Sequence, residues 1–251
     1  FSNNVISKLK KLKKKFIIID LSKKNKFKNE NNSFRISIGQ FGKIINLIKE
    51  KKSKKVLFAG KIAKPNFSSL RLDFKGIYYI PEVIKAAKIG DAAIIKSIIK
   101  ILANEGIQVI SSIKFNPELS LKKGNYSKLK PNKKDNLSIR KGKAYFNKMN
   151  SLDHVQALVI KDGKIISKEG KDGTKKMLAI LKKKTDGILI KLPKRQQDLR
   201  MDLPTIGLQT LKDIKKHGLK GVVLKSKKNI FLDKIKVISF ANKNKIFINI
   251  I

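Results

Sequence analysis

The chain contains no cysteine, no tryptophan and only two histidines among its 251 residues. Without cysteine it can form neither disulfides nor thiolate metal sites, and it has no thiol nucleophile. Two histidines, His154 and His217, are too few for an imidazole-rich zinc site. A catalytic metal would therefore need oxygen ligands, which favours Mg²⁺ or a similar hard cation.

Long hydrophobic runs are also missing. No uninterrupted apolar stretch approaches the ~18 residues that a membrane-spanning helix requires. We therefore expect a cytoplasmic protein, although its surface can still touch a membrane. Aromatic residues make up only 7% of the chain, which leaves few stacking platforms for single-stranded nucleic acid.

Acidic residues are scarce: 18 Asp and Glu stand against 60 Lys and Arg, giving a formal net charge of +42. Such a balance favours polyanionic partners, namely nucleic acid, acidic lipid or phosphorylated metabolites. The lysines, however, are spread along the whole chain, and isoleucine and asparagine are abundant as well, which indicates general compositional drift. We therefore expect no specific nucleic-acid partner. The hydrophobic fraction of 41% still supports a folded core.

The first part of the chain alternates between helical and strand patterns, which predicts a Rossmann-like, parallel-sheet N-terminal domain over residues 1–114. Because a helical pattern precedes the first strand pattern, we expect this domain to lack its first strand. One of its helices is predicted from about Pro81 to Lys88. Residues 115–137 are rich in Asn, Lys, Pro and Gly and are interpreted as a linker. The next helix is predicted near 138–150.

Residues 138–251 predict a C-terminal mixed α/β domain, which we expect to be the catalytic one. The apolar run 157–160 followed by Asp162-Gly163 predicts a hairpin, because Asp-Gly fits a two-residue turn with positive φ. A second hairpin is predicted from 221–224 to 231–232.

The segment 191–207, KLPKRQQDLRMDLPTIG, is the candidate active-site segment. It follows a buried-strand pattern, and ligands of α/β folds bind at the carboxyl ends of strands. Asp198, Arg200 and Asp202 are spaced two apart, so an extended backbone would present them on one face. The alternative is a polar loop whose aspartates cap the next helix and whose arginine pairs with one of them.

Cations and helix-terminal donors in the same segment suit a phosphorylated ligand. Lys191, Lys194 and Arg200 would neutralise a diphosphate. Thr205 and Gly207, just before a helical pattern, would donate to a phosphate oxygen at the positive end of that helix.

Carboxylates are mildly enriched around this segment. Five of the acids fall within residues 169–202, namely Glu169, Asp172, Asp186, Asp198 and Asp202. Carboxylates that bind one Mg²⁺ while cations neutralise a diphosphate are the usual arrangement for phosphoryl chemistry. His154, beside Asp153, is a less favoured general-base candidate, and His217 near a helix C-terminus is best explained by the helix dipole.

The motif DLRMDLPTIG (198–207), preceded by ILIKLPKRQ (188–196), resembles the signature of the LpxI-type UDP-2,3-diacylglucosamine pyrophosphatases. Further similar motifs occur in the same order along the chain. They are IGQFGKI (38–44), LFAGKIAKP (57–65), LRLD (70–73), GDAAII (90–95), NEGIQV (104–109), Asp153…Gln156-Ala157, Glu169…Met177 and GLKGVV (218–223).

This resemblance implies hydrolysis of UDP-2,3-diacylglucosamine to 2,3-diacylglucosamine 1-phosphate (lipid X) and UMP in lipid A biosynthesis. Water would attack the α-phosphorus with Mg²⁺ assistance, and the lipid would lie between the two domains. Expected partners are the lipid substrate and product and the anionic inner face of the inner membrane, where the protein would be peripheral. A homodimer is left open.

The resemblance also implies roles for individual side chains. Asp202 is the expected Mg²⁺ ligand or general base, with Asp198 as its helper and Arg200 on the diphosphate. The expected substrate-binding residues are Lys191, Lys194, Gln197, Thr205, Gly60, Gln156 and Thr174. The expected metal ligands are Asp202, Asp198, Asp172 and Glu169.

Three departures from the family pattern occur. Lys175 stands where an acid is usual, Arg195 where a proline is usual, and Lys225-Ser226-Lys227 where the family has E-A-G. Two alternatives therefore stay open: an inactive family member that binds the lipid, and a module that binds nucleic acid or anionic membranes through its charge.

Overall fold

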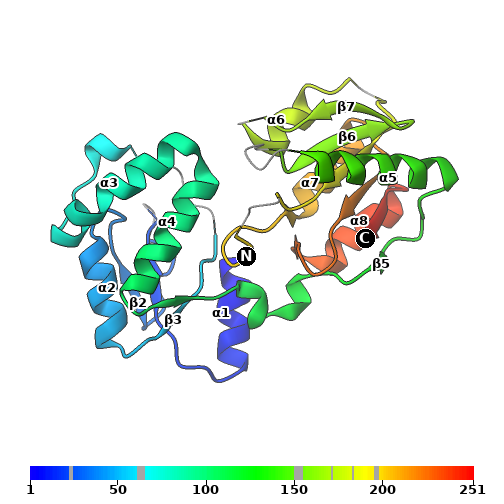
Figure 1. The fold of residues 1–251 in the computed structure, drawn as a ribbon. Coiled ribbons are helices and arrows are strands. Elements are labelled where there is room, and N and C mark those ends of the chain that lie inside the picture. Colours follow the sequence, from blue (N-terminus) through cyan, green and yellow to red (C-terminus); the bar gives the residue numbers. More distant parts are fainter. Residues whose placement is uncertain (23–24, 61–65, 150–154, 171, 183, 195–197) are drawn as a thin grey trace. The chain divides into compact units, whose positions relative to one another are not determined.

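A computed structural model of the chain describes residues 1–22, 25–60, 66–149, 155–170, 172–182, 184–194 and 198–251. The chain divides into two compact units, residues 1–116 and 117–251 (Figure 1). Both units combine helices with strands, so the predicted α/β class is confirmed.

The first unit has short strands that pair in parallel. Its helices are α1 (Ser2–Lys11), α2 (Phe41–Glu50), α3 (Phe74–Ile89) and α4 (Asp91–Asn104), and its strands are β1 (Ile18–Asp20), β2 (Ser33–Arg35), β3 (Lys55–Val56) and β4 (Gln108–Val109). Strand β1 pairs in parallel with β2, and β3 pairs in parallel with β4. The predicted parallel pairing is therefore confirmed, but the described strands form two separate pairs and not one continuous sheet.

Asp73 ties two helix N-termini of this unit together. Its Oδ1 accepts hydrogen bonds from the backbone N–H groups of Gly76 (2.8 Å) and Gly42 (3.0 Å), and its Oδ2 accepts one from Lys43 (2.9 Å). Burial acts to raise the pKa of Asp73, but these backbone donors outweigh it and lower the pKa. One carboxylate thus satisfies donors at the start of both α2 and α3.

Helix α3 begins at Phe74, well before the predicted start at Pro81, which lies inside the helix. The predicted start lay at the proline itself. It was wrong because the carboxylate of Asp73 caps the helix at an earlier position.

The second unit is built around one six-stranded sheet. Its helices are α5 (Lys133–Lys148), α6 (Gly173–Ala179), α7 (Leu208–Lys216) and α8 (Lys234–Lys243), and its strands are β5 (Gly124–Asn125), β6 (Ala157–Lys161), β7 (Lys164–Lys168), β8 (Ile188–Lys191), β9 (Thr205–Ile206), β10 (Gly221–Leu224), β11 (Ile230–Phe231) and β12 (Phe247–Ile250). The strand order is β5-β12-β10-β8-β6-β7. Strands β12, β10 and β8 are parallel to one another, and β5 and β6 run antiparallel to their neighbours in this group. The carboxyl ends of three adjacent strands therefore meet at one edge of the sheet.

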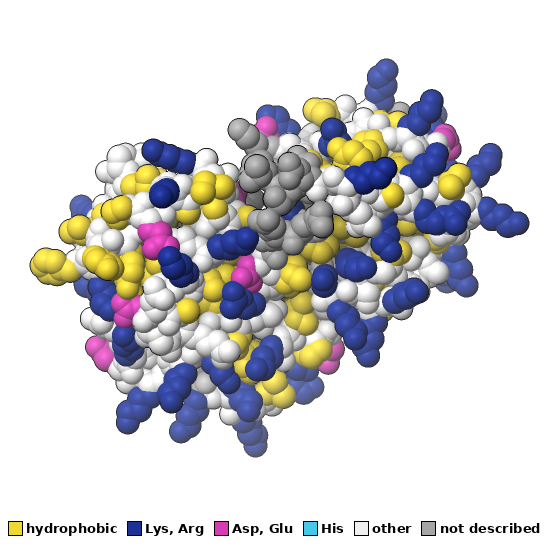
Figure 2. Space-filling model, in the orientation of Figure 1, with side chains coloured by type: hydrophobic (Ala, Val, Ile, Leu, Met, Phe, Trp, Pro, Cys, Tyr) yellow, Lys and Arg dark blue, Asp and Glu magenta, His cyan; other side chains and the backbone are white. Residues whose placement is uncertain are grey.

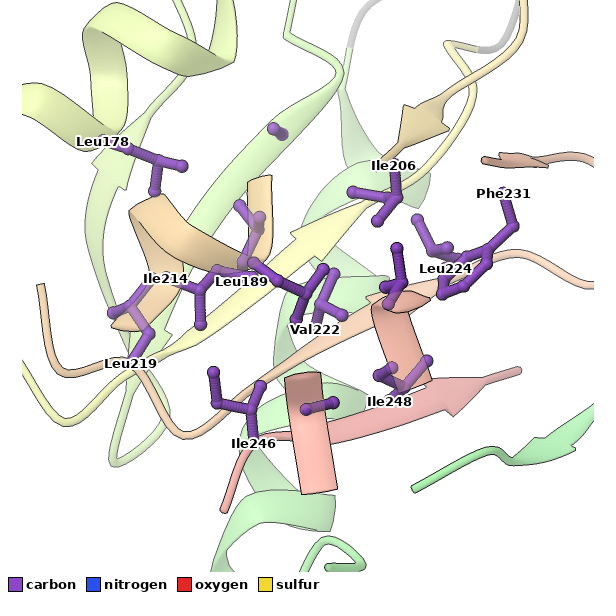
Figure 3. Close-up of a cluster of buried hydrophobic side chains, with 14 of the residues drawn as sticks. Leu178, Leu189, Ile206, Ile214, Leu219, Val222, Leu224, Phe231, Ile246 and Ile248 are labelled. Atoms are coloured by element: carbon purple, nitrogen blue, oxygen red, sulfur yellow. The ribbon is translucent and has the colours of Figure 1, made fainter. Parts of the chain in front are cut away.

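Helices cover both faces of this sheet because its central strands are apolar on both sides. In β8, Leu189 packs into the cluster formed with α6, α7 and α8, while Ile188 and Ile190 pack into the cluster formed with α5. This is the alternation expected of a strand. Figure 3 shows Leu189 and Val222 from the sheet among side chains from the surrounding helices. Helix α5 approaches closely because Gly142 has no side chain between it and Ile190.

The hairpin predicted around Asp162-Gly163 is confirmed. Strands β6 and β7 are antiparallel, Lys161 faces Lys164, and the two turn residues have φ of 48° and 75°. The second predicted hairpin is wrong. Strand β11 pairs in parallel with β9, since β10 already lies between β12 and β8 and has no free edge.

The segment interpreted as a linker, 115–137, contributes to the second unit. Its strand β5 pairs with β12, and α5 begins at Lys133, before the predicted start near 138. Asn132 and Asp135 form a capping box, in which each side chain accepts a hydrogen bond from the backbone N–H of the other.

Candidate active site

Four of the predicted site residues are connected by hydrogen bonds at the end of β8. The ammonium of Lys191 donates to the Thr174 hydroxyl oxygen (3.0 Å), and this hydroxyl donates to Glu169 Oε1 (2.6 Å). The other oxygen of Glu169 accepts from the backbone N–H of Gln156 (2.9 Å). We call Lys191, Thr174, Glu169 and Gln156 the strand-end network.

The register of the sheet brings this network together. Ala157, at the start of β6, faces Lys191 at the end of β8. The hairpin returns the chain so that the N–H of Glu169 donates to the carbonyl of Ala157 (2.9 Å). Thr174 then lies in the first turn of α6, on the same side. Residues far apart in sequence thus meet because a hairpin pairs antiparallel with a central strand.

The ammonium of Lys191 lies in an environment that disfavours its charge. Burial lowers the pKa of Lys191, the carboxylates of Glu169 and Asp202 act against this effect, and the Lys194 cation adds to it. The charges of Asp202 and Lys194 thus act on Lys191 of the strand-end network. An incoming phosphate would restore the balance, because an anion beside a buried ammonium favours its charged form.

Residues 198–202 form a turn, so the prediction of an extended segment was wrong. The carboxylate of Asp198 accepts hydrogen bonds from the backbone N–H of Arg200 (3.0 Å) and from its Nε (2.9 Å) and Nη2 (2.6 Å). The N–H of Asp202 donates to the carbonyl of Asp198 (3.0 Å). The aspartate side chain thus bonds locally, which competes with extended backbone. The arginine thus pairs with an aspartate, as in the alternative arrangement, but no side chain in the described part of the chain caps α7. The hydrogen bonds that Arg200 donates to Asp198 raise the pKa of Arg200.

The other predicted residues are placed as follows. Thr205 begins β9, and its hydroxyl donates to the carbonyl of Leu203 (3.0 Å). Asp172 is exposed and forms an ion pair with Lys176 (2.7 Å). Gly60 belongs to the first unit and has a φ of +119°, which favours glycine. Gln197, Asp153 and His154 lie outside the described residues.

His217 does not belong to the site. Its ring is buried, and Nδ1 lies 3.0 Å from the carbonyl oxygen of Leu181. This places it just after α7, in a structural role.

The four predicted metal ligands are not all brought together. Among the residues that the structure describes, no three His, Asp or Glu side chains gather in a way that would hold a metal ion. Asp198 is engaged by Arg200 and Asp172 by Lys176. Mg²⁺ in phosphoryl-transfer sites, however, commonly takes only one or two carboxylates and completes its shell with phosphate and water oxygens. Asp202 and Glu169 both act on the charge of Lys191, and a metal ion held by these two carboxylates stays a prediction.

A cavity of about 870 Å³ lies in this unit beside α5. Its lining residues are Lys123, Lys133, Asn136, Ile139, Arg140, Lys143, Lys225, Ser226 and Ile251. Lys225 and Ile251 directly follow β10 and β12, so the cavity lies at the same edge of the sheet as Lys191, on the face that α5 covers.

Sequence reasoning missed Asn229, which supports the neighbouring strands. Its amide is fully buried: Oδ1 accepts from the N–H of Leu121 (3.1 Å), and Nδ2 donates to the carbonyls of Leu121 (3.2 Å) and Lys225 (2.6 Å). These bonds fix the turn before β11, the strand that pairs with Thr205 and Ile206 of β9. In a Lys- and Asn-rich turn, a single asparagine carries no signal that would reveal this role.

Within the described residues, no helix combines the length and apolar character needed to cross a membrane.

Comparison with known protein families decides the relationship. Residues 1–119 match the LpxI N-terminal domain, and residues 122–249 match the LpxI C-terminal domain. The chain belongs to the LpxI family. It is 29% identical over 223 residues to the UDP-2,3-diacylglucosamine pyrophosphatase LpxI of Caulobacter vibrioides (strain ATCC 19089 / CIP 103742 / CB 15), an alignment that covers 85% of this chain and 80% of that protein.

The LpxI assignment confirms the resemblance drawn from the 198–207 motif. The gap between the two matched domains, after residue 119 and before residue 122, falls close to the boundary between the two units at 116 and 117. The strand-end network and Asp202 all lie within the LpxI C-terminal domain.

Proposed function

We propose that this LpxI-family chain hydrolyses UDP-2,3-diacylglucosamine to 2,3-diacylglucosamine 1-phosphate and UMP, as a peripheral enzyme of lipid A biosynthesis. The observation that carries the proposal is the largely buried Lys191 ammonium at the end of a central strand of the sheet, held by Thr174 and acted on by the charges of Glu169 and Asp202. Such a site needs an anion to balance its cations and offers carboxylates for a metal or a proton. The substrate named for the Caulobacter relative contains the diphosphate that would supply this anion.

In the reaction, the cations of Lys191 and Lys194 bind the diphosphate and offset the negative charge that develops on it. Glu169 accepts a hydrogen bond from the Thr174 hydroxyl, whose oxygen accepts one from the Lys191 ammonium. The cation is therefore oriented before the substrate binds. The oxygen of water forms a bond to the α-phosphorus, and the bond from this phosphorus to the bridging oxygen breaks. UMP carries the new oxygen, and the lipid 1-phosphate leaves.

Asp202 is assigned to the attacking water, as the acceptor of its proton or as a ligand of the metal. Mg²⁺, when bound by Asp202 and Glu169, would neutralise charge on the diphosphate oxygens and lower the pKa of a bound water. Arg200 forms an ion pair with Asp198 and is a further cation of the active-site segment. Its side chain stays 46% exposed, so the guanidinium is accessible to a substrate.

The test is release of UMP from UDP-2,3-diacylglucosamine in the presence of Mg²⁺. We expect release by the wild-type chain, its loss on chelation of the metal, and a loss of about 10²-fold or more in Asp202→Ala. Asp213→Ala is the matched control, because Asp213 is an aspartate of α7 in the same unit whose carboxylate accepts a hydrogen bond from Gln209, four residues earlier on the same helix. Wild-type rates in Asp202→Ala would contradict the assigned role. A wild-type chain that binds lipid X but releases no UMP would instead be the inactive, lipid-binding family member.

A further inference from the structure

Helix α3 of the first unit keeps large hydrophobic side chains in solvent. Five of the eleven large hydrophobic residues that stay exposed on the described chain lie on this one helix. They are Phe74 (93% exposed), Tyr78 (77%), Ile89 (60%), Ile77 (58%) and Ile84 (37%). The other six lie on separate elements or loops, one at each place, and single exposed hydrophobic residues need no explanation. The five residues of α3, in contrast, form a patch, and an exposed hydrophobic patch needs an explanation.

The spacing of these residues puts them on one face of the helix. Phe74, Ile77, Tyr78 and Ile84 follow the helical repeat of three and four residues. Pro81, which lies between them, is exposed as well. Figure 2 shows hydrophobic side chains gathered on the side of the first unit where Figure 1 places α3. We call the five residues together the α3 face.

The opposite side of α3 is held firmly in the unit, so the exposure does not arise from a loosely packed helix. Asp73 caps the helix and ties it to α2. The hydroxyl of Tyr79 donates to Glu105 (2.9 Å), and the Lys75 ammonium donates to the same carboxylate. Gly76 and Ala86 are buried. The fold therefore presents the α3 face outward on a fixed support.

The charges around this face are positive. Arg71 precedes the helix, and Lys85 and Lys88 lie on its last turns; all three are exposed. The acid of α3, Glu82, faces Lys100 of α4 across 3.7 Å. An apolar face with lysines beside it is the arrangement of helices that lie in the interface of an anionic membrane, where aromatic and aliphatic side chains enter the headgroup region and the cations meet lipid phosphates.

We propose that the α3 face docks the chain onto an anionic lipid bilayer. This deepens the proposed function, because an enzyme whose substrate is a membrane lipid gains from residence at the membrane. The docking itself needs neither substrate nor catalysis. The two proposals therefore fail separately: vesicles without substrate test docking, and UMP release tests the reaction.

The absence of tryptophan offers a direct measurement of insertion. Phe74→Trp places a single reporter on the α3 face, and Ile235→Trp places a matched reporter at an 86% exposed position on α8. With vesicles of phosphatidylglycerol and phosphatidylethanolamine, we expect the emission of Phe74→Trp to shift to the blue and to be quenched by brominated acyl chains. The emission of Ile235→Trp should stay that of a water-exposed residue. Equal behaviour of the two reporters would overturn the proposal.

Vesicle partition must be separated from attraction by the overall charge. At about 0.5 M salt, where charges are screened within a few Å, we expect the wild type and Ile235→Asp to stay bound to these vesicles. The double variant Phe74→Asp and Ile77→Asp should lose about tenfold or more of this binding, since two apolar anchors are removed. Both variants change exposed residues, and their thermal melting should match the wild type.

Two further outcomes would overturn the proposal. In one, the double variant partitions onto vesicles as the wild type does. In the other, the wild type is a dimer that the double variant dissociates while vesicle binding is unchanged; the α3 face would then be a contact between two copies of this chain.

Discussion

At the scale of single residues, Glu105 shows how one acid organises several cations. Its carboxylate accepts hydrogen bonds from Lys49 (2.7 Å), from Lys75 and from the Tyr79 hydroxyl (2.9 Å). The hydrogen bonds from Lys49 and Lys75 are the main cause that lowers the pKa of Glu105 to about 2. Because Lys49 belongs to α2, Lys75 and Tyr79 belong to α3, and Glu105 directly follows α4, Glu105 fixes the support on which the α3 face rests.

The lowered pKa of Glu105 predicts a pH-dependent loss of stability. Since the folded-state pKa lies below the unfolded-state value, the stabilisation is complete above the ordinary range of a glutamate and is lost as the pH falls toward 2. Glu105→Gln should lower the free energy of unfolding by about 1–3 kcal/mol at neutral pH and by much less near pH 3. Urea unfolding at both pH values measures this. Glu50→Gln, at an exposed position of α2, is the control; an equal loss for Glu105→Gln at both pH values would contradict the assignment.

For Lys191 we predict the opposite effect on stability, because its environment disfavours its charge. Burial lowers the pKa of Lys191 in spite of Glu169 and Asp202, so the folded chain binds this proton less tightly than the unfolded chain does. The charged Lys191 therefore lowers the free energy of unfolding at pH values below its folded-state pKa. This destabilisation disappears as the pH rises above that pKa. Lys191→Met should leave the free energy of unfolding at neutral pH equal to or above that of the wild type, while kcat/KM for UMP release falls about 10²-fold.

The activity of the wild type should also decline on the alkaline side, as the Lys191 ammonium loses its proton at a lower pH than an ordinary lysine. Lys191→Met should show a flat alkaline profile at its reduced rate. Lys220→Met, at a lysine that directly precedes β10 and forms ion pairs with Asp135 and Asp186, should keep both the rate and the profile of the wild type. A Lys191→Met variant that is destabilised and keeps the alkaline decline would show that Lys191 is structural.

At the scale of elements, the sequence predicts what is local. The hairpin β6–β7 was found because its turn residues, Asp162-Gly163, are adjacent to each other and to the strands that they join. The start of α3 was missed although its cap is local: Asp73 directly precedes the helix and accepts a hydrogen bond from the N–H of Gly76. The pairing of β9 with β11 was missed because it is not local: each strand has two residues, and only the occupied edges of β10 direct β11 elsewhere.

The same distinction holds in the site. Lys191, Thr174, Glu169 and Gln156 were all among the predicted site residues, but only the register of β6 against β8 brings them into one network. The geometry of residues 198–202 could not be read from a spacing of two, because that spacing assumes an extended backbone. Whether an aspartate bonds to its own neighbours or points outward depends on the local turn, which the pattern of charges does not encode.

At the scale of the whole molecule, the charge of +42 is spread and not focused. Figure 2 shows Lys and Arg side chains over the whole visible face of both units. The basic cavity beside α5 adds a local concentration, with Lys123, Lys133, Arg140, Lys143 and Lys225 around it. A chain of this kind attracts any polyanion at low salt, so nucleic-acid binding alone would not establish a nucleic-acid function.

We therefore expect weak, sequence-independent binding of nucleic acid that depends steeply on salt. For a chain that neutralises about 6–10 phosphates, affinity should fall about 10³–10⁵-fold between roughly 50 and 200 mM salt. Fluorescence anisotropy with short labelled duplexes of unrelated sequence measures this. Removing two cations of the cavity, Arg140→Ala with Lys143→Ala, should weaken binding no more than Lys215→Ala with Lys216→Ala on α7, because the attraction is that of the whole surface. Sequence-selective binding that persists at the higher salt and depends on the cavity pair would mean that the charge serves a nucleic-acid interface after all.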